Sequence, residues 1–585
     1  MVNTTITTLS ILLCLCTLPV SARDIVDIQV NSSHKKMLTY GKGDAELIML
    51  NKDFHRWYVL KIRWPRLGYY QSFHLENPYP NLQKVTVSKN RRLLVLSEGK
   101  SKVNCDLLSK AGRMNLRKAV RSTKPFVKIC SDKLFLRNQV VGDMSTKEVA
   151  VDFMRDHIWG GEDMISKIKD TIYKDAELIT ADVTISKTKK ASNAASDGPG
   201  PALVSKQFEH ARTTPGELGI EAEIEEDGTM FMGKWYRSKN SKDIYVGVIQ
   251  AQAVHENILT SYPRRVLPLD SVEPSAMIYL VSFDLTDLEV GYSVGTEHPK
   301  VSYSERTASH LKVPGWPGPD GIGSYFPLAG TGRLNPYDAK RAVATFTGGF
   351  KRKHSVFRAG PPSQKNGGTH YGFVQNGVIF STLHPGLATA YVDQEGVLRI
   401  KTWTKEDKSQ VNRLMFARQN GLPLVYRNNK GKVLPGKLVR HNFRGNWSGS
   451  KQNTVRALRT GLCAKTVDGR RFITFAYFSA HTPNAMARVF QAYGCDYAMH
   501  LDMNMMVHTY LATYHSEVGK PTQIEHIVKD MHWKDRKYGD HKIPRFVVVP
   551  DNRDFFYILR RKKEDTSLTA TDKPTFDKVD DGTIN

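Results

Sequence analysis

The amino-acid sequence predicts an α+β fold, and two observations carry this prediction. Strand-like runs such as 57–62 and 93–96 come early in the chain, and helical patterns follow near 147–155 and 163–173. Further on, the apolar run 278–285 has the composition of a central strand. The first part of the mature chain is therefore expected to form an α+β region of its own, ahead of a larger domain built around a buried sheet.

The first residues of the chain have the features of a secretory signal peptide. An apolar stretch at 11–20 leads to Val20, Ser21 and Ala22, a small-residue segment of the kind that signal peptidase cuts. The stretch is too short to span a bilayer. We therefore expect residues 1–22 to be removed and the mature protein to be secreted or periplasmic, with no integral membrane span. An uncleaved anchor is the alternative.

Cysteine usage agrees with export. The chain has 6 cysteines, two of them in the leader, so four remain in the mature protein. An even number suits an oxidising compartment. The pairs nearest in sequence are Cys105–Cys130 and Cys463–Cys495, and we expect these two disulfides among the three connectivities that four cysteines allow. The spacings match no zinc pattern.

The net charge restricts the kinds of partner. The 585 residues carry a formal charge of +26, which favours anionic partners such as phosphate-bearing polymers, acidic lipid surfaces or nucleic acid. The basic residues are scattered, so a solvated basic surface is the structural alternative. Nucleic-acid binding would call for interleaved aromatic and basic residues on a recognised fold, and the sequence shows no such pattern. Nucleic acid is therefore not the expected partner.

Composition also suggests how the mature chain is divided. We expect an α+β accessory region at 23–188 without a catalytic constellation, and a flexible linker at 189–206, where Ala, Ser, Gly and Pro dominate. A β-rich connecting region at 207–277 and a second domain at 278–550 follow. The charged end at 560–585 is poor in apolar residues and should be disordered.

The candidate catalytic residue with the strongest sequence signal is Asp502. A helix is expected after Thr482 as N-cap, with Pro483 in its first turn and Gly494 as its stop. The segment 496–501 then alternates like a short strand, and Asp502 follows its last apolar residue. This pattern places a carboxylate at the end of a buried strand, where sites are often built. A carboxylate that only caps the next turn is the structural alternative.

Two neighbours of Asp502 extend this candidate site. His500, Asp502 and Asn504 alternate on one side of an extended chain, so a divalent cation site is an open alternative. Three mixed ligands without an obvious fourth do not make a complete centre. We therefore expect neither a metal nor another cofactor.

Three further features lie in the second domain. Gly348 and Gly349 end a strand and can present backbone N–H groups to a phosphate or sugar oxygen, although a tight turn explains them as well. His370, flanked by glycines, precedes a hairpin with its turn at 376–377, and it is either an acid/base group or a structural residue. Arg459 comes just before a buried strand pair and suits bidentate phosphate recognition.

Taken in order, these motifs resemble the phosphodiester glycosidase family over about residues 278–549. The family includes a lysosomal enzyme that removes N-acetylglucosamine from a phosphodiester, and bacterial exopolysaccharide-associated proteins. The resemblance implies a mixed β-sheet domain of catalytic type. Matched by position, Gly348 and Gly349 stand in the family's Asn-Gly-Gly-Phe loop, Arg459 opens its central strand pair, and Asp502 is the aspartate of its Leu-Asp-Gly-Gly-Gly loop.

The chain departs from the family pattern at two places. Thr347 stands where Asn is usual, and Met503, Asn504, Met505 and Met506 replace the glycines after Asp502, as in a divergent branch. These changes leave the fold inference intact but bear on substrate and activity.

The resemblance predicts a secreted hydrolase that cleaves a sugar-1-phosphodiester bond in a glycan or cell-surface polymer. Gly348, Gly349 and Arg459 would hold the phosphate, with Asn504 as a further substrate contact. Asp502 would support the anomeric carbon or activate water, and His500 or His370 would move a proton. The alternative is a non-catalytic secreted module that binds anionic glycans or polysaccharide, which the loss of the glycines favours.

Overall fold

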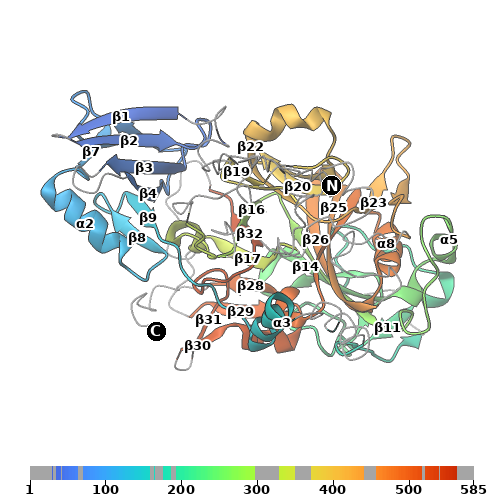
Figure 1. The fold of residues 1–585 in the computed structure, drawn as a ribbon. Coiled ribbons are helices and arrows are strands. Elements are labelled where there is room, and N and C mark those ends of the chain that lie inside the picture. The colour runs from blue at the N-terminus through green and yellow to red at the C-terminus, as the bar shows by residue number, and fades with distance from the viewer. Residues whose placement is uncertain are drawn as a thin grey trace, which may run out of the picture.

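The structure is a computed structural model. It describes residues 29, 34–40, 43–63, 70–158, 164, 175–185, 193–296, 329–349, 371–381, 383–440, 456–516, 521–538 and 541–562. The expected signal peptide, His370 and residues 563–585 of the expected tail lie outside these ranges. The described chain is rich in strands and forms several sheets, which agrees with an α+β fold at a coarse level (Figure 1).

The N-terminal part contains two sheets and a helix, at the left of Figure 1. The six-stranded sheet has the order β1 (His34–Tyr40), β2 (Gly43–Met49), β3 (Trp57–Arg63), β4 (Tyr70–Glu76), β9 (Leu134–Arg137) and β8 (Phe126–Ile129). The second sheet consists of β5 (Gln83–Val87), β6 (Leu94–Glu98) and β7 (Ser101–Cys105). The helix is α2 (Lys110–Val120), which begins where the Ser109 side chain accepts a hydrogen bond from Gly112 N. The strands expected from the runs at 57–62 and 93–96 are therefore confirmed.

The largest sheet runs through the second part of the chain and is antiparallel. Its order is β13 (Trp235–Ser238), β14 (Ser241–Gln250), β15 (Met277–Asp284), β26 (Arg470–His481), β25 (Ala457–Val467), β27 (Tyr497–Met503), β23 (Pro423–Arg427) and β24 (Val433–Pro435). Every residue of β15 is buried, which confirms the central strand expected at 278–285.

Two five-stranded sheets accompany the large sheet. One has the order β16 (Leu288–Ser293), β32 (Phe555–Arg560), β17 (Ala342–Thr347), β28 (Leu511–His515) and β29 (Gln523–His526). The other has the order β19 (Val378–Ser381), β18 (Phe373–Gln375), β22 (Leu414–Gln419), β20 (Ala388–Asp393) and β21 (Leu398–Thr402). The Phe346 ring on β17 lies 5.3 Å from Phe556 on the neighbouring strand β32 and 5.3 Å from Phe475 on β26, so this sheet packs against the large sheet.

Short elements complete the described fold. The small strands are β10 (Thr184–Ile185), β11 (Ala211–Thr213), β12 (Met230–Phe231), β30 (Arg536–Tyr538) and β31 (His541–Ile543). The remaining helices are α3 (Thr146–His157), α5 (Glu256–Leu259), α6 (Pro336–Ala339) and α8 (Pro483–Ala492). The 3-10 turns are η1 (Lys206–Phe208), η2 (Ala251–Ala253), η5 (Glu406–Arg413), η6 (Met506–His508) and η7 (Lys529–Lys534). Helix α3 confirms the helical pattern expected near 147–155.

The N-terminal sheet shares buried contacts with the rest of the chain. Trp57 belongs to the same apolar core as the large sheet. The buried Glu76 carboxylate accepts hydrogen bonds from Trp57 Nε1 at 3.0 Å and from Asn335 Nδ2 at 2.9 Å. Asn51 Nδ2 donates to Gly377 O at 2.9 Å. Apolar packing and buried hydrogen bonds thus join the two parts, and the division into domains stays a prediction.

The segment expected as a flexible linker lies along the large sheet where the structure describes it. Ala195 N donates to Trp235 O at 2.7 Å, and Ala202 N donates to Gly233 O at 2.8 Å. The low apolar content of the segment led to the expectation of a free linker. Backbone hydrogen bonds, which do not depend on side-chain type, connect the described residues 193–206 to their neighbours, and the linker at 189–206 stays a prediction.

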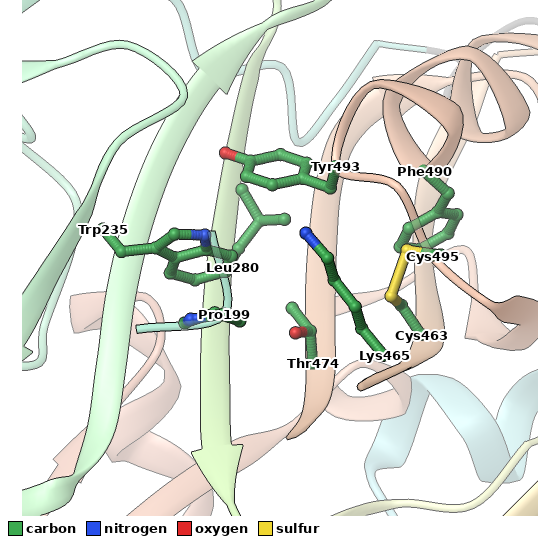
Figure 2. A pocket seen from close by; sticks show the side chains of 9 residues that line it. All are labelled: Pro199, Trp235, Leu280, Cys463, Lys465, Thr474, Phe490, Tyr493 and Cys495. Atoms are coloured by element: carbon green, nitrogen blue, oxygen red, sulfur yellow. A yellow bond between two sulfur atoms is a disulfide. The ribbon is translucent and has the colours of Figure 1, made fainter. Parts of the chain in front are cut away.

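Both expected disulfides are formed. Cys105 and Cys130 are bridged with their Cα atoms 5.1 Å apart, and Cys463 and Cys495 are bridged with their Cα atoms 5.7 Å apart. The second bridge ties β25 to the short segment between α8 and β27 (Figure 2). Among the described residues, no helix has both the length and the apolar content needed to cross a membrane.

Candidate functional site

The candidate site begins on β27, which carries His500 and Asp502 between β25 and β23. Helix α8 leads into this strand: the Thr482 side chain caps its start, and Gly494 follows its end with φ +69°, as the sequence predicts. All seven residues of β27 are buried. Thr460 Oγ1 on β25 donates to Asp502 O at 2.8 Å, which fixes the backbone at the carboxylate.

Asp502 is buried, with 4% of its surface exposed. Its Oδ1 accepts a hydrogen bond from Met503 N at 2.9 Å, and its Oδ2 accepts one from Arg553. Burial raises the pKa of Asp502 to about 6, because the charged carboxylate has lost its water; Arg553 offsets part of this effect, while the carboxylates of Asp554 and Glu148 add to it. Asp502 can therefore gain and lose a proton near neutral pH.

The guanidinium of Arg553 joins Asp502 to the N-terminal part of the chain. Arg553 Nη2 donates to Glu148 Oε1 at 3.1 Å, and Asn552 Nδ2 donates to the same oxygen at 3.2 Å. Glu148 lies in the first turn of α3 and is itself buried. A helix from before residue 160 thus supplies one of the acidic groups around the candidate catalytic carboxyl.

A second ion pair lies next to the first along the chain. The buried Asp554 carboxylate accepts a hydrogen bond from Arg418 Nε at 2.6 Å and one from the Tyr292 hydroxyl at 3.1 Å. We call Asp502, Arg553, Glu148, Asp554 and Arg418 the carboxylate–arginine cluster. Its two arginines and three acids come from four places in the chain, because Arg553 and Asp554 are neighbours.

The paired glycines lie against this cluster. Gly348 N donates to Asp554 O at 2.8 Å, so the Gly348 amide is engaged within the protein. A Cβ at Gly348 would lie 2.5 Å from Asp554 Oδ2, and one at Gly349 would lie 2.8 Å from Asn420 Oδ1. Gly349 also has φ +148°, which side-chain-bearing residues rarely adopt. The glycines allow a close approach of the backbone to Asp554 and Asn420.

Arg459 lies in a different set of contacts. It is fully buried, and its Nε donates to His481 O at 2.9 Å. Its Nη1 lies 3.2 Å from His500 Nε2 and 3.2 Å from Met503 Sδ. Burial lowers the pKa of Arg459 to about 9. We call Arg459, His481 and His500 the arginine–histidine cluster.

Both histidines of this cluster are held in the neutral form. Burial, with the positive charge of Arg459, lowers the pKa of His500 well below its ordinary value, and burial lowers that of His481 to about 3. His500 Nε2 accepts from Arg459, and its Nδ1 donates to Leu501 O at 2.6 Å. His500 therefore positions Arg459 rather than carrying charge of its own.

The structure brings some of the expected residues together and leaves others apart. His500 and Asp502, two residues apart on β27, link the two clusters. Asn504 follows with φ +80°, and its N donates to Leu458 O at 2.7 Å. Within the ranges that the structure describes, no three His, Cys, Asp or Glu side chains are arranged to hold a metal ion.

Sequence reasoning missed Arg553, Asp554, Arg418 and Glu148. A signal was present for two of them, because the polar run 551–554 stands between two apolar runs, at 546–549 and 555–559. Such a charged stretch between strands is a typical location for site residues. No comparable pattern marks Glu148 or Arg418.

Comparisons with known proteins give weak likenesses only. No family model matches the chain, and no curated protein matches it. The solved catalytic domain of zebrafish N-acetylglucosamine-1-phosphodiester alpha-N-acetylglucosaminidase, auto-inhibited by its pro-peptide, aligns over 56% of this chain and 86% of its own, at 10% identity and a TM-score of 0.30. A hypothetical protein from Synechocystis aligns over 90% of this chain and 99% of its own, at 8% identity and a TM-score of 0.28. Structural similarities this weak establish neither the activity nor the substrate of this chain.

Proposed function

We propose that this protein is a secreted hydrolase that cleaves the bond between the anomeric carbon of a sugar and a phosphodiester, in a glycan or cell-surface polymer. The observation that carries the proposal is the buried Asp502 carboxyl, whose pKa of about 6 suits a group that takes up a proton near neutral pH. The order of motifs that resembles the phosphodiester glycosidases supports the same reading. The two disulfides are compatible with an extracellular protein.

The proposed reaction needs a carboxylate and positively charged side chains, and the two clusters contain both. A phosphodiester leaves as a weakly basic anion, so it needs positive charge more than it needs an acid, while the oxocarbenium-like carbon needs a carboxylate. Arg459 and Arg553 are buried guanidinium groups that contact His500 and Asp502, two side chains of β27. In a site shielded from water, such charges act on a phosphate far more strongly than they would in solution.

The proposed reaction is an attack of water on the anomeric carbon. A water oxygen bonds to the anomeric carbon while the bond from that carbon to the phosphate oxygen breaks, and the electron pair of that bond stays on the phosphate. Ionised Asp502 takes the proton that the water loses. The products are a free sugar and a phosphate monoester. His500 holds Arg459 in position and does not itself transfer the proton, because burial keeps it neutral.

A non-catalytic module that holds an anionic glycan is the second candidate. The burial of Asp502 and its ion pair with Arg553 favour it, because a substrate reaches the carboxylate only after Arg553 or a covering segment shifts. The replacement of the family glycines at 503–506 points the same way.

The test is sugar release by the mature protein from a panel of methyl phosphoglycosides and nucleotide sugars. Asp502→Asn removes the proton acceptor, and Asp468→Asn, in the exposed turn between β25 and β26, makes the same chemical change away from the site. Release by the parent and Asp468→Asn proteins, but not by Asp502→Asn, supports the hydrolase. Glycan binding without release by any of the three supports the binding module.

A further inference from the structure

One segment of the N-terminal part carries positive charge without any acid. Residues 107–131 include helix α2 and strand β8 and contain no Asp or Glu. Their basic residues are Lys110, Arg113, Arg117, Lys118, Arg121, Lys124 and Lys128. Figure 1 shows α2 at the outer edge of the N-terminal part, away from the large sheet. The segment thus concentrates part of the chain's net charge of +26 in one place.

The packing of α2 turns its basic side chains outward. Leu116 and Ala119 belong to the apolar core of the N-terminal part, and Gly112 is buried on the same side of the helix. At about 100° per residue, the five basic residues of 110–121 fall within a sector of about 140° on the opposite side. Four of them are exposed, and Arg113 is partly exposed. The outward face of α2 is therefore a basic surface.

Four of these residues form a row along the outward face. Lys110, Arg113, Arg117 and Arg121 follow one another at spacings of three and four positions, so successive members lie about one helical turn apart. With a rise of about 1.5 Å per residue, the row is about 16 Å long. Lys118 lies beside it. Positive charges at regular intervals along a line suit a linear polymer with repeated acidic groups better than one small anion.

The end of α2 is held in place, and the whole segment is closed by a disulfide. The buried Asn138 side chain donates from Nδ2 to Ala119 O at 2.9 Å and to Lys124 O at 3.1 Å. The bridge between Cys105 and Cys130 joins the chain just before α2 to the chain just after β8. A row of charges that is already in position loses less conformational freedom on binding than a mobile one.

The composition of the outward face distinguishes among anionic partners. A helix that enters a bilayer surface offers an apolar face to the lipid, but in α2 the apolar face is buried within the protein. Met114 and Val120 are 60% and 39% exposed, yet they lie about 120° apart around the helix and do not form a second apolar face. Residues 107–125 contain no aromatic side chain that could stack on nucleic-acid bases. An anionic glycan needs neither feature.

We propose that the outward face of α2 binds a linear anionic glycan. The polymer lies along the helix, and its acidic groups contact Lys110, Arg113, Arg117 and Arg121, with Lys118 at the side. Each contact is open to water and therefore weak, so the affinity comes from the number of contacts made at once. The proposal does not depend on the reaction at Asp502; if both hold, the N-terminal part binds the polymer that the second part cleaves.

Calorimetric titration of the full mature protein with heparin fragments of defined length tests this assignment. A heparin octasaccharide, which reaches several members of the row, should bind, and a heparin disaccharide should bind at least several-fold more weakly. Binding of the octasaccharide should weaken steeply as salt is added, because the contacts are ionic. The double variant Lys110→Gln, Lys118→Gln should weaken it about 3–10-fold, as expected for two exposed charge pairs, and should make its salt dependence shallower.

The matched control is the double variant Lys430→Gln, Lys432→Gln. It removes two exposed lysines in the turn between β23 and β24, at the other side of Figure 1. An equal loss of affinity in this control would show attraction to the overall positive charge and overturn the site on α2. So would unchanged binding in the Lys110→Gln, Lys118→Gln protein, or equal affinities for the two heparin fragments.

Two further probes separate the glycan from other polyanions. A DNA duplex and vesicles of phosphatidylglycerol should both bind more weakly than the octasaccharide. Tighter binding of either one, lost in the Lys110→Gln, Lys118→Gln protein, would assign the face to nucleic acid or to lipid and overturn the proposal. Sugar release that fails in every protein, with octasaccharide binding that still depends on Lys110 and Lys118, would refute the hydrolase and leave the glycan site standing.

Discussion

The guanidinium of Arg553 contacts the carboxylate of Asp502 across a separation of 51 residues, and both side chains are buried. The same guanidinium also binds Glu148, so one positive charge is shared by two acids that are far apart in the chain. This arrangement places the candidate catalytic carboxyl inside the folded core rather than on a surface loop. Its stability and its function are therefore coupled.

Replacing Arg553 should destabilise the protein, and the loss should depend on pH. Arg553→Gln leaves two buried carboxylates without their counter-charge, which costs about 3–5 kcal/mol at pH 8. The cost should be smaller at pH 5, because protonation removes the uncompensated charge. Urea unfolding at the two pH values measures it. Arg560→Gln, whose side chain is 40% exposed, should cost less than about 1 kcal/mol. An equal loss for Arg553→Gln at both pH values would contradict the shared-charge account.

The raised pKa of the Asp502 carboxyl should also make the free energy of unfolding depend on pH. Its pKa in the folded protein, about 6, is above its ordinary value of 3.8, so the folded state binds more protons than the unfolded state between these values. Its contribution to the free energy of unfolding should therefore be present in full below pH 4 and be lost as the pH rises to about 6. Subtracting the profile of Asp502→Asn from that of the parent isolates this slope. A flat difference would mean that the carboxyl has an ordinary pKa.

The glycine next to Asp554 should not tolerate a side chain. In Gly348→Ala the new methyl group would lie 2.5 Å from Asp554 Oδ2, an oxygen that Arg418 and Tyr292 hold in place. We expect a loss of about 1–3 kcal/mol in stability, because the ion pair must shift. Gly216→Ala is the control, since no atom lies within 4 Å of its added Cβ. Equal thermal midpoints for the two variants would show that the backbone at Gly348 has room.

The disulfide between Cys463 and Cys495 should contribute to stability by closing a loop. The two cysteines are 32 residues apart, and a loop of this length corresponds to about 3–4 kcal/mol in the chain-entropy description. The double variant Cys463→Ala, Cys495→Ala should unfold at correspondingly lower denaturant, and reductant should shift the parent toward it. A parent protein that is insensitive to reductant and equal to the double variant would show that the bridge adds nothing.

Sequence patterns anticipated the elements that depend on near neighbours. Thr482, Pro483 and Gly494 lie within or beside one helix, and the apolar run 278–285 needs no partner to be recognised as a buried strand. The two disulfides followed from counting cysteines and pairing the nearest ones. In each of these cases the residues that decide the outcome are close together in the chain.

The contacts that define the candidate site join residues that are far apart in the chain. Arg553 and Glu148 are 405 residues apart, and nothing in the local pattern of either indicates the other. The expectation for Arg459 illustrates the same point. Its sequence position suits phosphate recognition, which stays a prediction, and the register of β25 against β27 places its guanidinium beside His500 and Met503. Only the pairing of distant strands fixes such a neighbourhood.

The most direct test of the central claim is the position of the new oxygen when a methyl phosphoglycoside is hydrolysed in water labelled with heavy oxygen. If the bond from the anomeric carbon breaks and Asp502 activates the water, the label appears in the released sugar, and Asp502→Asn releases neither product. Label in the phosphate would mean attack at phosphorus, which contradicts a glycosidase. Full turnover by Asp502→Asn would contradict the role assigned to this carboxyl.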